Sequence, residues 1–278
     1  GDPLFGGKDP VGSEVKESDN HLFSAAFTFP DPQLVPITGP DQVQYSHFLL
    51  GGVDPNGSAA GMPDVPVYRR MLAVPHGATP RIQWQTEAGA ELTTVLYPSQ
   101  PAPMDQGGGA MKPPFDDLPF AKDDKAYASD AGFPAQAVDL QPLGQMRDLD
   151  VWQLALAAGQ YNPAQGVLRT FKGINLEITF EGGSGGFLPE DTANNPFDQS
   201  FAGLYAQALN YPAVQKYLDP SILGKRFCIG NEFVIVTDPA FRPAADALRT
   251  WKISKGISTA VVETGAPSVG TTPVQIRD

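Results

Sequence analysis

The sequence contains a single cysteine, Cys228, in 278 residues. An internal disulfide is therefore excluded, and the fold must be stabilised without one. Two settings fit this composition: a reducing compartment, or an exported bacterial protein that never relied on disulfides. Cys228 lies in an apolar stretch with no neighbouring base, which favours a buried core residue over a nucleophile.

Basic runs and long apolar runs are also missing. The chain has 19 Lys and Arg residues against 31 Asp and Glu residues, and its net charge is −12. Nucleic acids and anionic membranes attract clustered Lys and Arg, so the sequence predicts no nucleic-acid partner. No apolar stretch approaches the roughly 18 residues that a membrane-spanning helix needs.

Catalytic and metal-binding patterns are absent as well. The three histidines, His21, His47 and His76, are scattered and form no metal-ligand spacing. Pairs of acidic residues could hold calcium through oxygen ligands, but none fits an EF-hand loop, and a solvated acidic surface is the favoured interpretation. These pairs are Asp116-Asp117, Asp123-Asp124 and Glu190-Asp191. We predict no catalytic residue, no metal site and no cofactor in this chain, with calcium in a longer parent protein left open.

Short runs of β-branched and aromatic residues recur between turn signals, and the 29 glycines and 28 prolines are spread along the chain. In Ile174 to Phe180 apolar and polar residues alternate, as in a strand with one buried face. Residues 1–20 are polar and Gly-rich and predict a flexible leader. Residues 21–226 predict an antiparallel β-sandwich domain of the jelly-roll kind. Strands are expected at 21–29, 43–50, 65–74, 81–85, 92–97, 151–157 and 174–180, with a hairpin across Glu87 to Glu91 and one helix at Gln199 to Leu209.

The segment from Pro98 to Ala135 interrupts this pattern because it contains no credible strand. A loop of this length inside a compact domain is usually functional or disordered. It carries Lys112, Lys122 and Lys125 among prolines and acidic residues. Each lysine by itself could be a solvated charge, whereas the loop as a whole is a candidate functional element.

Residues 227–278 show a different pattern, after a dibasic pair, Lys225-Arg226, at the expected domain boundary. The apolar run from Phe233 to Val236 predicts a strand buried on both faces. A helix is expected to start at Asp238 and Pro239 and to stop near Gly256, and a second strand should follow. This is the opening strand–helix–strand unit of a parallel α/β domain, and we expect the rest of that domain beyond Asp278.

Three segments carry a family resemblance: Val65 to Trp84, Met146 to Gly183, and Glu232 to Gly265. They resemble the propeptide and the start of the caspase-like catalytic domain of gingipain-type cysteine peptidases. The resemblance implies a secreted or cell-surface bacterial zymogen with its signal peptide removed, in which a β-rich propeptide aids folding and caps its cognate cysteine peptidase domain. The catalytic His and Cys of the family are expected beyond Asp278, so this chain alone should have no peptidase activity.

The resemblance also implies roles for basic residues. A loop lysine would enter the specificity pocket of the peptidase as a substrate does. Lys112 is attractive because a Lys-Pro bond with Pro113 resists most peptidases, and Lys122 is the alternative. Lys225 and Arg226 would form the maturation site, with cleavage after Arg226.

A second hypothesis comes from a different class of function. The β-sandwich could be a carbohydrate- or protein-binding adhesion module of a secreted bacterial protein. An exposed aromatic platform would favour that function, whereas contacts carried on the Pro98 to Ala135 loop would favour an inhibitor.

Overall fold

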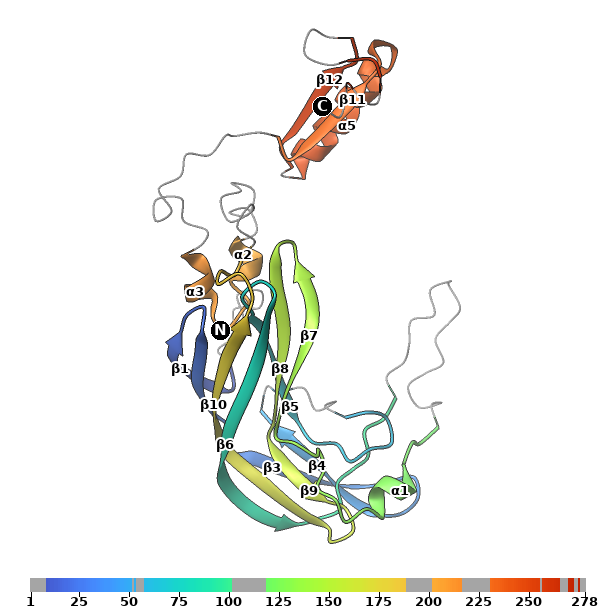
Figure 1. Ribbon diagram of the computed structural model, residues 1–278. Coiled ribbons are helices and arrows are strands. Elements are labelled where there is room, and N and C mark those ends of the chain that lie inside the picture. The colour runs from blue at the N-terminus through green and yellow to red at the C-terminus, as the bar shows by residue number, and fades with distance from the viewer. Residues whose placement is uncertain are drawn as a thin grey trace.

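The computed structural model describes residues 9–51, 53, 58–101, 119–188, 202–216, 231–255, 257–265, 270–272 and 275. Within these ranges the chain is mainly β, with antiparallel pairing throughout its larger sheets, as the sequence predicts (Figure 1). The strands up to residue 182 are β1 (Gly12–Ser18), β2 (Leu22–Thr28), β3 (Pro32–Thr38), β4 (Gln44–Leu50), β5 (Val67–Ala73), β6 (Ala78–Thr93), β7 (Val138–Met146), β8 (Leu149–Ala157), β9 (Gly159–Asn162) and β10 (Val167–Gly182).

These strands form three sheets. The largest has the order β1-β2-β10-β6, with β9 also paired to β10; β5-β8-β7 form a second sheet, and β3-β4 form a third. The long strand β10 pairs with β2, β6 and β9 and therefore organises the first sheet. Its predicted alternation is confirmed, since Ile174, Leu176 and Ile178 are buried while the residues between them face solvent.

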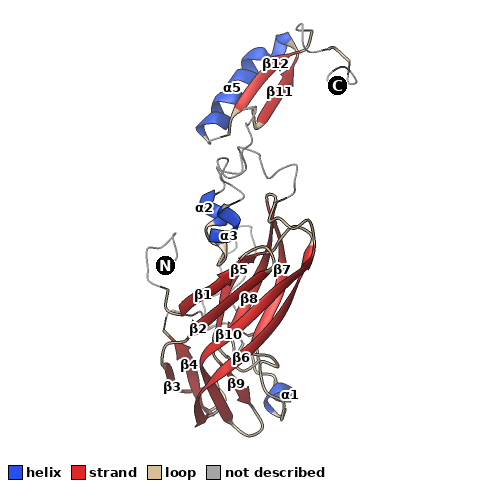
Figure 2. Cartoon of the chain, turned by 60° about the vertical axis from the view of Figure 1, so that its left-hand side comes forward, coloured by secondary structure: helices blue, strands red, loops and turns tan. Residues whose placement is uncertain are grey.

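One apolar core joins the sheets. It includes Phe23 and Phe27 from β2, Leu72 from β5, Leu156 from β8 and Ile178 from β10, all almost fully buried. Burying each such side chain contributes about 1.5–3 kcal/mol. The short helix α1 (Asp124–Tyr127) lies at one end of this β domain, and α2 (Ala202–Tyr205) and α3 (Tyr211–Gln215) lie at the other end (Figures 1 and 2).

The predicted leader is wrong for the part that the structure describes. Residues Gly12–Ser18 form β1, which pairs with β2 as the edge of the first sheet. Most side chains of β1 are exposed, so apolar and polar residues do not alternate in its sequence. Its main chain nevertheless pairs with β2 along the strand. Val11, just before it, is buried in the core, and the Asp9 carboxylate pairs with Arg70.

The predicted hairpin across Glu87 to Glu91 is also wrong, because β6 continues through it as one strand of 16 residues. Bulges in β10 near Phe171 absorb the irregularity of the pairing. Gly89 serves close approach instead of a turn: a Cβ there would lie 2.5 Å from Thr170 Oγ1.

The helix predicted at Gln199 to Leu209 is helical, in its described part, only over α2. Turns follow at 206–210, with one isolated bridge from Ala208 to Met71, before α3 begins. The Leu209 N–H donates to the Met71 carbonyl in β5 at 2.9 Å. The Asn210 side chain bonds both backbone groups of Ala73, at 2.9 and 2.8 Å. These hydrogen bonds to the edge strand β5 stabilise the turns more than a continued helix would, although the apolar residues of the segment have a helical spacing.

The C-terminal residues form the expected parallel strand–helix–strand unit: β11 (Phe233–Thr237), the 3₁₀ turn η3 (Pro239–Phe241), α5 (Arg242–Ser254) and β12 (Thr259–Glu263). The Asp238 carboxylate accepts from the Ala240 N–H, so the predicted start is confirmed; Gly256 lies outside the described residues. The expected burial of β11 on both faces is wrong, since Val234 is 51% exposed, because one helix covers only one face of two strands. No helix in the described ranges has the length and apolar character of a membrane span.

Candidate functional site

The basic residues singled out in the sequence fall into two groups. Lys112, in 102–118, and Lys225 and Arg226, in 217–230, lie outside the described residues, as does Cys228. Lys122 and Lys125 are described: Lys122 lies two residues before α1, and Lys125 lies within it, where the long loop returns to the β domain. The two stems of this loop, residues 98–101 and 119–123, are the part whose geometry can be stated.

Gln100 joins the two stems through its side chain. Its Nε2 donates to the Ala121 carbonyl at 3.0 Å, and its Oε1 accepts from the Ala121 N–H at 3.0 Å. Nε2 also donates to the Pro98 carbonyl at 2.8 Å. One amide side chain therefore satisfies both backbone groups of a residue 21 positions later.

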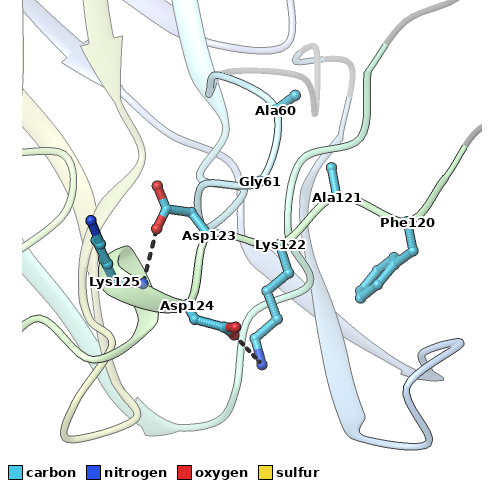
Figure 3. A pocket seen from close by; sticks show the side chains of 8 residues that line it. All are labelled: Ala60, Gly61, Phe120, Ala121, Lys122, Asp123, Asp124 and Lys125. Carbon is cyan, nitrogen blue, oxygen red and sulfur yellow. Dashed lines mark hydrogen bonds and ion pairs between the residues drawn. The ribbon is translucent and has the colours of Figure 1, made fainter.

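Gly61 lies between the stems and bonds to both. Its N–H donates to the Ser99 carbonyl at 2.7 Å, and its carbonyl accepts from the Asp123 N–H at 2.9 Å. Its φ of +86° favours glycine, and a Cβ would lie 3.1 Å from the Asp123 nitrogen. Figure 3 shows Gly61 next to Asp123 and Ala121.

Lys122 has partners within the chain. Its ammonium lies 3.5 Å from Asp124 Oδ1 (Figure 3). It also lies 4.0 Å from Asp41 Oδ2 and 5.4 Å from the centre of the Tyr127 ring. Its side chain is 26% exposed. Lys122 thus ties the second stem to the turn between β3 and β4.

An aromatic cluster supports the same stem. The ring of Tyr97 lies 5.6 Å from Tyr45, 5.7 Å from Phe120 and 4.6 Å from His47. The Tyr45 hydroxyl donates to Asp41 Oδ2 at 2.6 Å. That hydrogen bond holds the pKa of Asp41 below its usual value, while burial foremost, and then Asp41, raises the pKa of Tyr45. Burial lowers the pKa of His47.

Both carboxylates of the acidic pair Asp123-Asp124 have partners within the chain. Asp123 caps α1 by accepting from the N–H groups of Lys125 and Ala126, at 2.9 and 3.1 Å, and Asp124 faces Lys122. In the ranges that the structure describes, no three His, Cys, Asp or Glu side chains are grouped so as to hold a metal ion. A pocket of about 610 Å³ opens here, and its lining consists of Ala60, Gly61, Phe120, Ala121, Lys122, Asp123, Asp124 and Lys125 (Figure 3).

Sequence reasoning found Lys122 but missed Gln100, Gly61 and the Asp41–Tyr45 pair. Gly61 belongs to a Gly- and Pro-containing stretch whose turn signal could have been followed. Gln100 gives no signal, because a single polar residue between prolines does not reveal a partner 21 positions away. The other two histidines have separate surroundings: His21 is exposed and His76 lies 3.2 Å from Asp150.

A protein-family model matches most of the β domain. The Propeptide_C25 family model matches residues 9–202. Among curated proteins, Lys-gingipain HG66 of Porphyromonas gingivalis is 28% identical over 265 residues, and Lys-gingipain W83 of the same species is 27% identical over 265 residues. The match covers 92% of this chain but only 14% of each relative.

Two solved structures share the fold. The complex of Porphyromonas gingivalis RgpB pro- and mature domains matches with a TM-score of 0.59 and 19% identity, over 74% of this chain and 100% of the other. A structure described as an insight into the zymogenic latency of gingipain K, also from Porphyromonas gingivalis, matches with a TM-score of 0.50 and 22% identity. That match covers 63% of this chain and 94% of the other. At these identities the two structures support the fold alone.

Proposed function

Because this chain belongs to the Propeptide_C25 family, we propose that its β domain is the inhibitory propeptide of a gingipain-type cysteine endopeptidase zymogen. The observation that carries the proposal is the family match over residues 9–202, which spans the β domain and the long loop. The partner is the cognate peptidase domain of the same precursor. The parent protein is a secreted or cell-surface bacterial protein whose signal peptide is removed, and the propeptide also assists its folding.

The loop between the two stems blocks the active site. Both stems are hydrogen-bonded to Gly61, and the Gln100 side chain joins them to each other, so the loop loses less entropy on binding than a free peptide does. A lysine from the loop enters the specificity pocket, where pairing with a buried acidic group makes it an anchor of the interface.

Lys112 is the better candidate for this lysine. Lys122 already contacts Asp41, Asp124 and the Tyr127 ring, and entering another protein's pocket would break these contacts. Lys112 stands between the stems in sequence and directly precedes Pro113, and that bond resists cleavage.

Maturation separates the β domain from the peptidase domain at Lys225-Arg226. The pair lies in sequence between α3, which ends at Gln215, and β11, which begins at Phe233. Cleavage after Arg226 gives the peptidase a new N-terminus at Phe227. The catalytic His and Cys lie beyond Asp278 in the parent, so the chain alone hydrolyses no peptide.

The test uses the full precursor, its mature peptidase and the released propeptide. Lys112→Ala is expected to raise the inhibition constant at least about tenfold, since truncating a central interface residue costs about 2 kcal/mol or more. Lys122→Ala should change it less than about threefold and instead lower stability by about 1 kcal/mol or less. Lys125→Ala, at an exposed neighbouring position, is the control. An unchanged constant for Lys112→Ala excludes Lys112 as the pocket residue.

The adhesion-module hypothesis has less support. A carbohydrate-binding platform needs exposed aromatic rings, and none of the Phe, Tyr or Trp side chains described before residue 217 falls in the exposed class. A glycan-binding screen on the isolated chain checks this, with no binding expected.

A further inference from the structure

Prolines limit strand pairing between the two loop stems. Pro98, Pro101 and Pro119 lack the backbone N–H that a ladder requires. The Gln100 amide takes the place of a ladder residue: it presents one donor and one acceptor side by side, and both meet the backbone of Ala121 at 3.0 Å.

Gly61 completes this junction from the other side. Its N–H and carbonyl bond one stem each. The positive φ would strain any other residue, and a Cβ would lie 3.1 Å from the Asp123 nitrogen. The hydrogen bonds of Gly61 and Gln100 are separate from the Lys122 side-chain contacts, which hold the second stem. The Tyr97–Phe120 ring contact adds an apolar link between the residue before the first stem and the second stem.

We propose that Gln100 is a positioning residue for inhibition: its side chain sets the spacing and direction of the two stems from which the inhibitory loop extends. The proposal rests on the proposed function for its effect on inhibition, whereas the junction itself can be measured in the isolated chain. At neutral pH glutamine suits this position, because it combines this length with both a donor and an acceptor, whereas an ionised glutamate only accepts.

Two substitutions separate the parts of this junction. Gln100→Met keeps the length and removes all three side-chain hydrogen bonds, the two to Ala121 and the one to the Pro98 carbonyl. Gln100→Glu keeps the size, and its ionised carboxylate accepts from the Ala121 N–H but cannot donate to the Ala121 carbonyl. Near pH 3.5 most of this carboxyl, with an ordinary pKa of about 4.3, is protonated and can again donate and accept. Gln83→Met, at an exposed position of β6, is the matched control.

The first readout is the protection factor of the Ala121 amide in the isolated chain, from hydrogen exchange corrected for the intrinsic rate at each pH. We expect Gln100→Met to lower it at least about tenfold at pH 7, as loss of about 1.4 kcal/mol does. Gln100→Glu keeps the acceptor for the Ala121 N–H, but its carboxylate repels the Ala121 carbonyl, so protection should fall less at pH 7 than in Gln100→Met and recover toward the native value at pH 3.5. The control should keep native protection, and the urea midpoints of all variants should stay close to that of the native chain.

The second readout is inhibition of the mature peptidase from the same precursor at pH 7. Gln100→Met should raise the inhibition constant at least about tenfold, a change of about 1.4 kcal/mol. If Lys112→Ala weakens inhibition and Gln100→Met does not, the positioning role is overturned while the proposed function stands. If neither variant weakens inhibition, the loop-based mechanism itself fails. Two results contradict the claim that Gln100 holds the backbone of Ala121. One is native protection of the Ala121 amide in Gln100→Met, and the other is protection that stays low in Gln100→Glu at pH 3.5.

Discussion

At the scale of single residues, the Asp41–Tyr45 pair links the β3–β4 turn to the loop stem. The Tyr45 hydroxyl bonds Asp41 Oδ2, and the Tyr45 ring packs on Tyr97. Because the bond favours the ionised carboxylate, the folded protein holds the pKa of Asp41 below the unfolded value of 3.8. Its contribution to stability is present above pH 3.8 and is lost as the pH falls through the lower, folded value.

This linkage gives a pH-dependent prediction. Tyr45→Phe should lower the free energy of unfolding near pH 7, and the deficit should shrink as the pH falls below 3.8, because the protonated carboxyl no longer gains from the bond. Urea denaturation between pH 2.5 and 7 measures it. Tyr127→Phe is the control, since the Tyr127 hydroxyl donates to the Leu96 carbonyl and its deficit should not vary over this range. A constant deficit for Tyr45→Phe contradicts the linkage.

The lysines illustrate what sequence can predict about single residues. Charge, a neighbouring proline and the position within a long loop were enough to select Lys112 and Lys122 as candidates. They did not reveal that Lys122 contacts Asp41, 81 positions earlier, since that pairing arises from the fold. The same reason hides Gln100 and Asn210, whose partners are backbone groups of distant residues.

At the scale of elements, the segment joining α2 to α3 closes the free edge of β5. Asn210 is fully buried and lies at the start of α3, where an asparagine usually caps the helix. Here its side chain caps no helix N–H and instead bonds the N–H and carbonyl of Ala73, which is also fully buried.

Removing this side chain should therefore be costly. Asn210→Ala leaves two buried backbone groups without partners, and we expect a loss of about 2–4 kcal/mol in the free energy of unfolding. Asn175→Ala, an exposed residue of β10 that accepts one hydrogen bond from Lys16, should lose less than about 0.5 kcal/mol. Equilibrium urea unfolding of both variants gives the comparison, and a loss below 1 kcal/mol for Asn210→Ala refutes the role of this contact.

Which elements could be predicted follows from their burial. Strands that bury several apolar side chains, such as β2, β4, β5, β8 and β10, carry β-branched and aromatic residues between turn signals, and the sequence predicts them. The sequence does not predict the edge strand β1, because most of its side chains face solvent. It divides β6 in two, because a glycine at position 89 is typical of a turn, whereas Gly89 allows a close contact between β6 and Thr170. The α2–α3 segment was misassigned because its contacts to β5 are not visible in its own sequence.

At the scale of the whole molecule, the family match confirms the resemblance stated from sequence, and the antiparallel β fold is confirmed. The C-terminal unit exposes several large apolar residues on β11 and α5, including Val234 and Trp251. A described ion pair between the two parts is Arg147–Glu232, at 3.0 Å, and a partly exposed pair of this kind contributes at most about 1 kcal/mol.

The β domain should consequently fold without the C-terminal unit. A chain of residues 9–216 should unfold in one cooperative step, within about 2 kcal/mol of the full chain, because the core and the Asn210 contacts are retained. Residues 231–278 alone should remain unfolded, since two strands and a helix bury too little apolar surface. Circular dichroism during urea titration tests both, and a shortened chain that fails to fold contradicts this division.

The most direct test of the inhibitory role measures the activity of the mature peptidase from the full precursor as this purified chain is titrated in. The account predicts that activity falls to near zero at about one equivalent and that the chain alone hydrolyses nothing. Full activity at a large molar excess of folded chain, or hydrolysis by the chain itself, would contradict it.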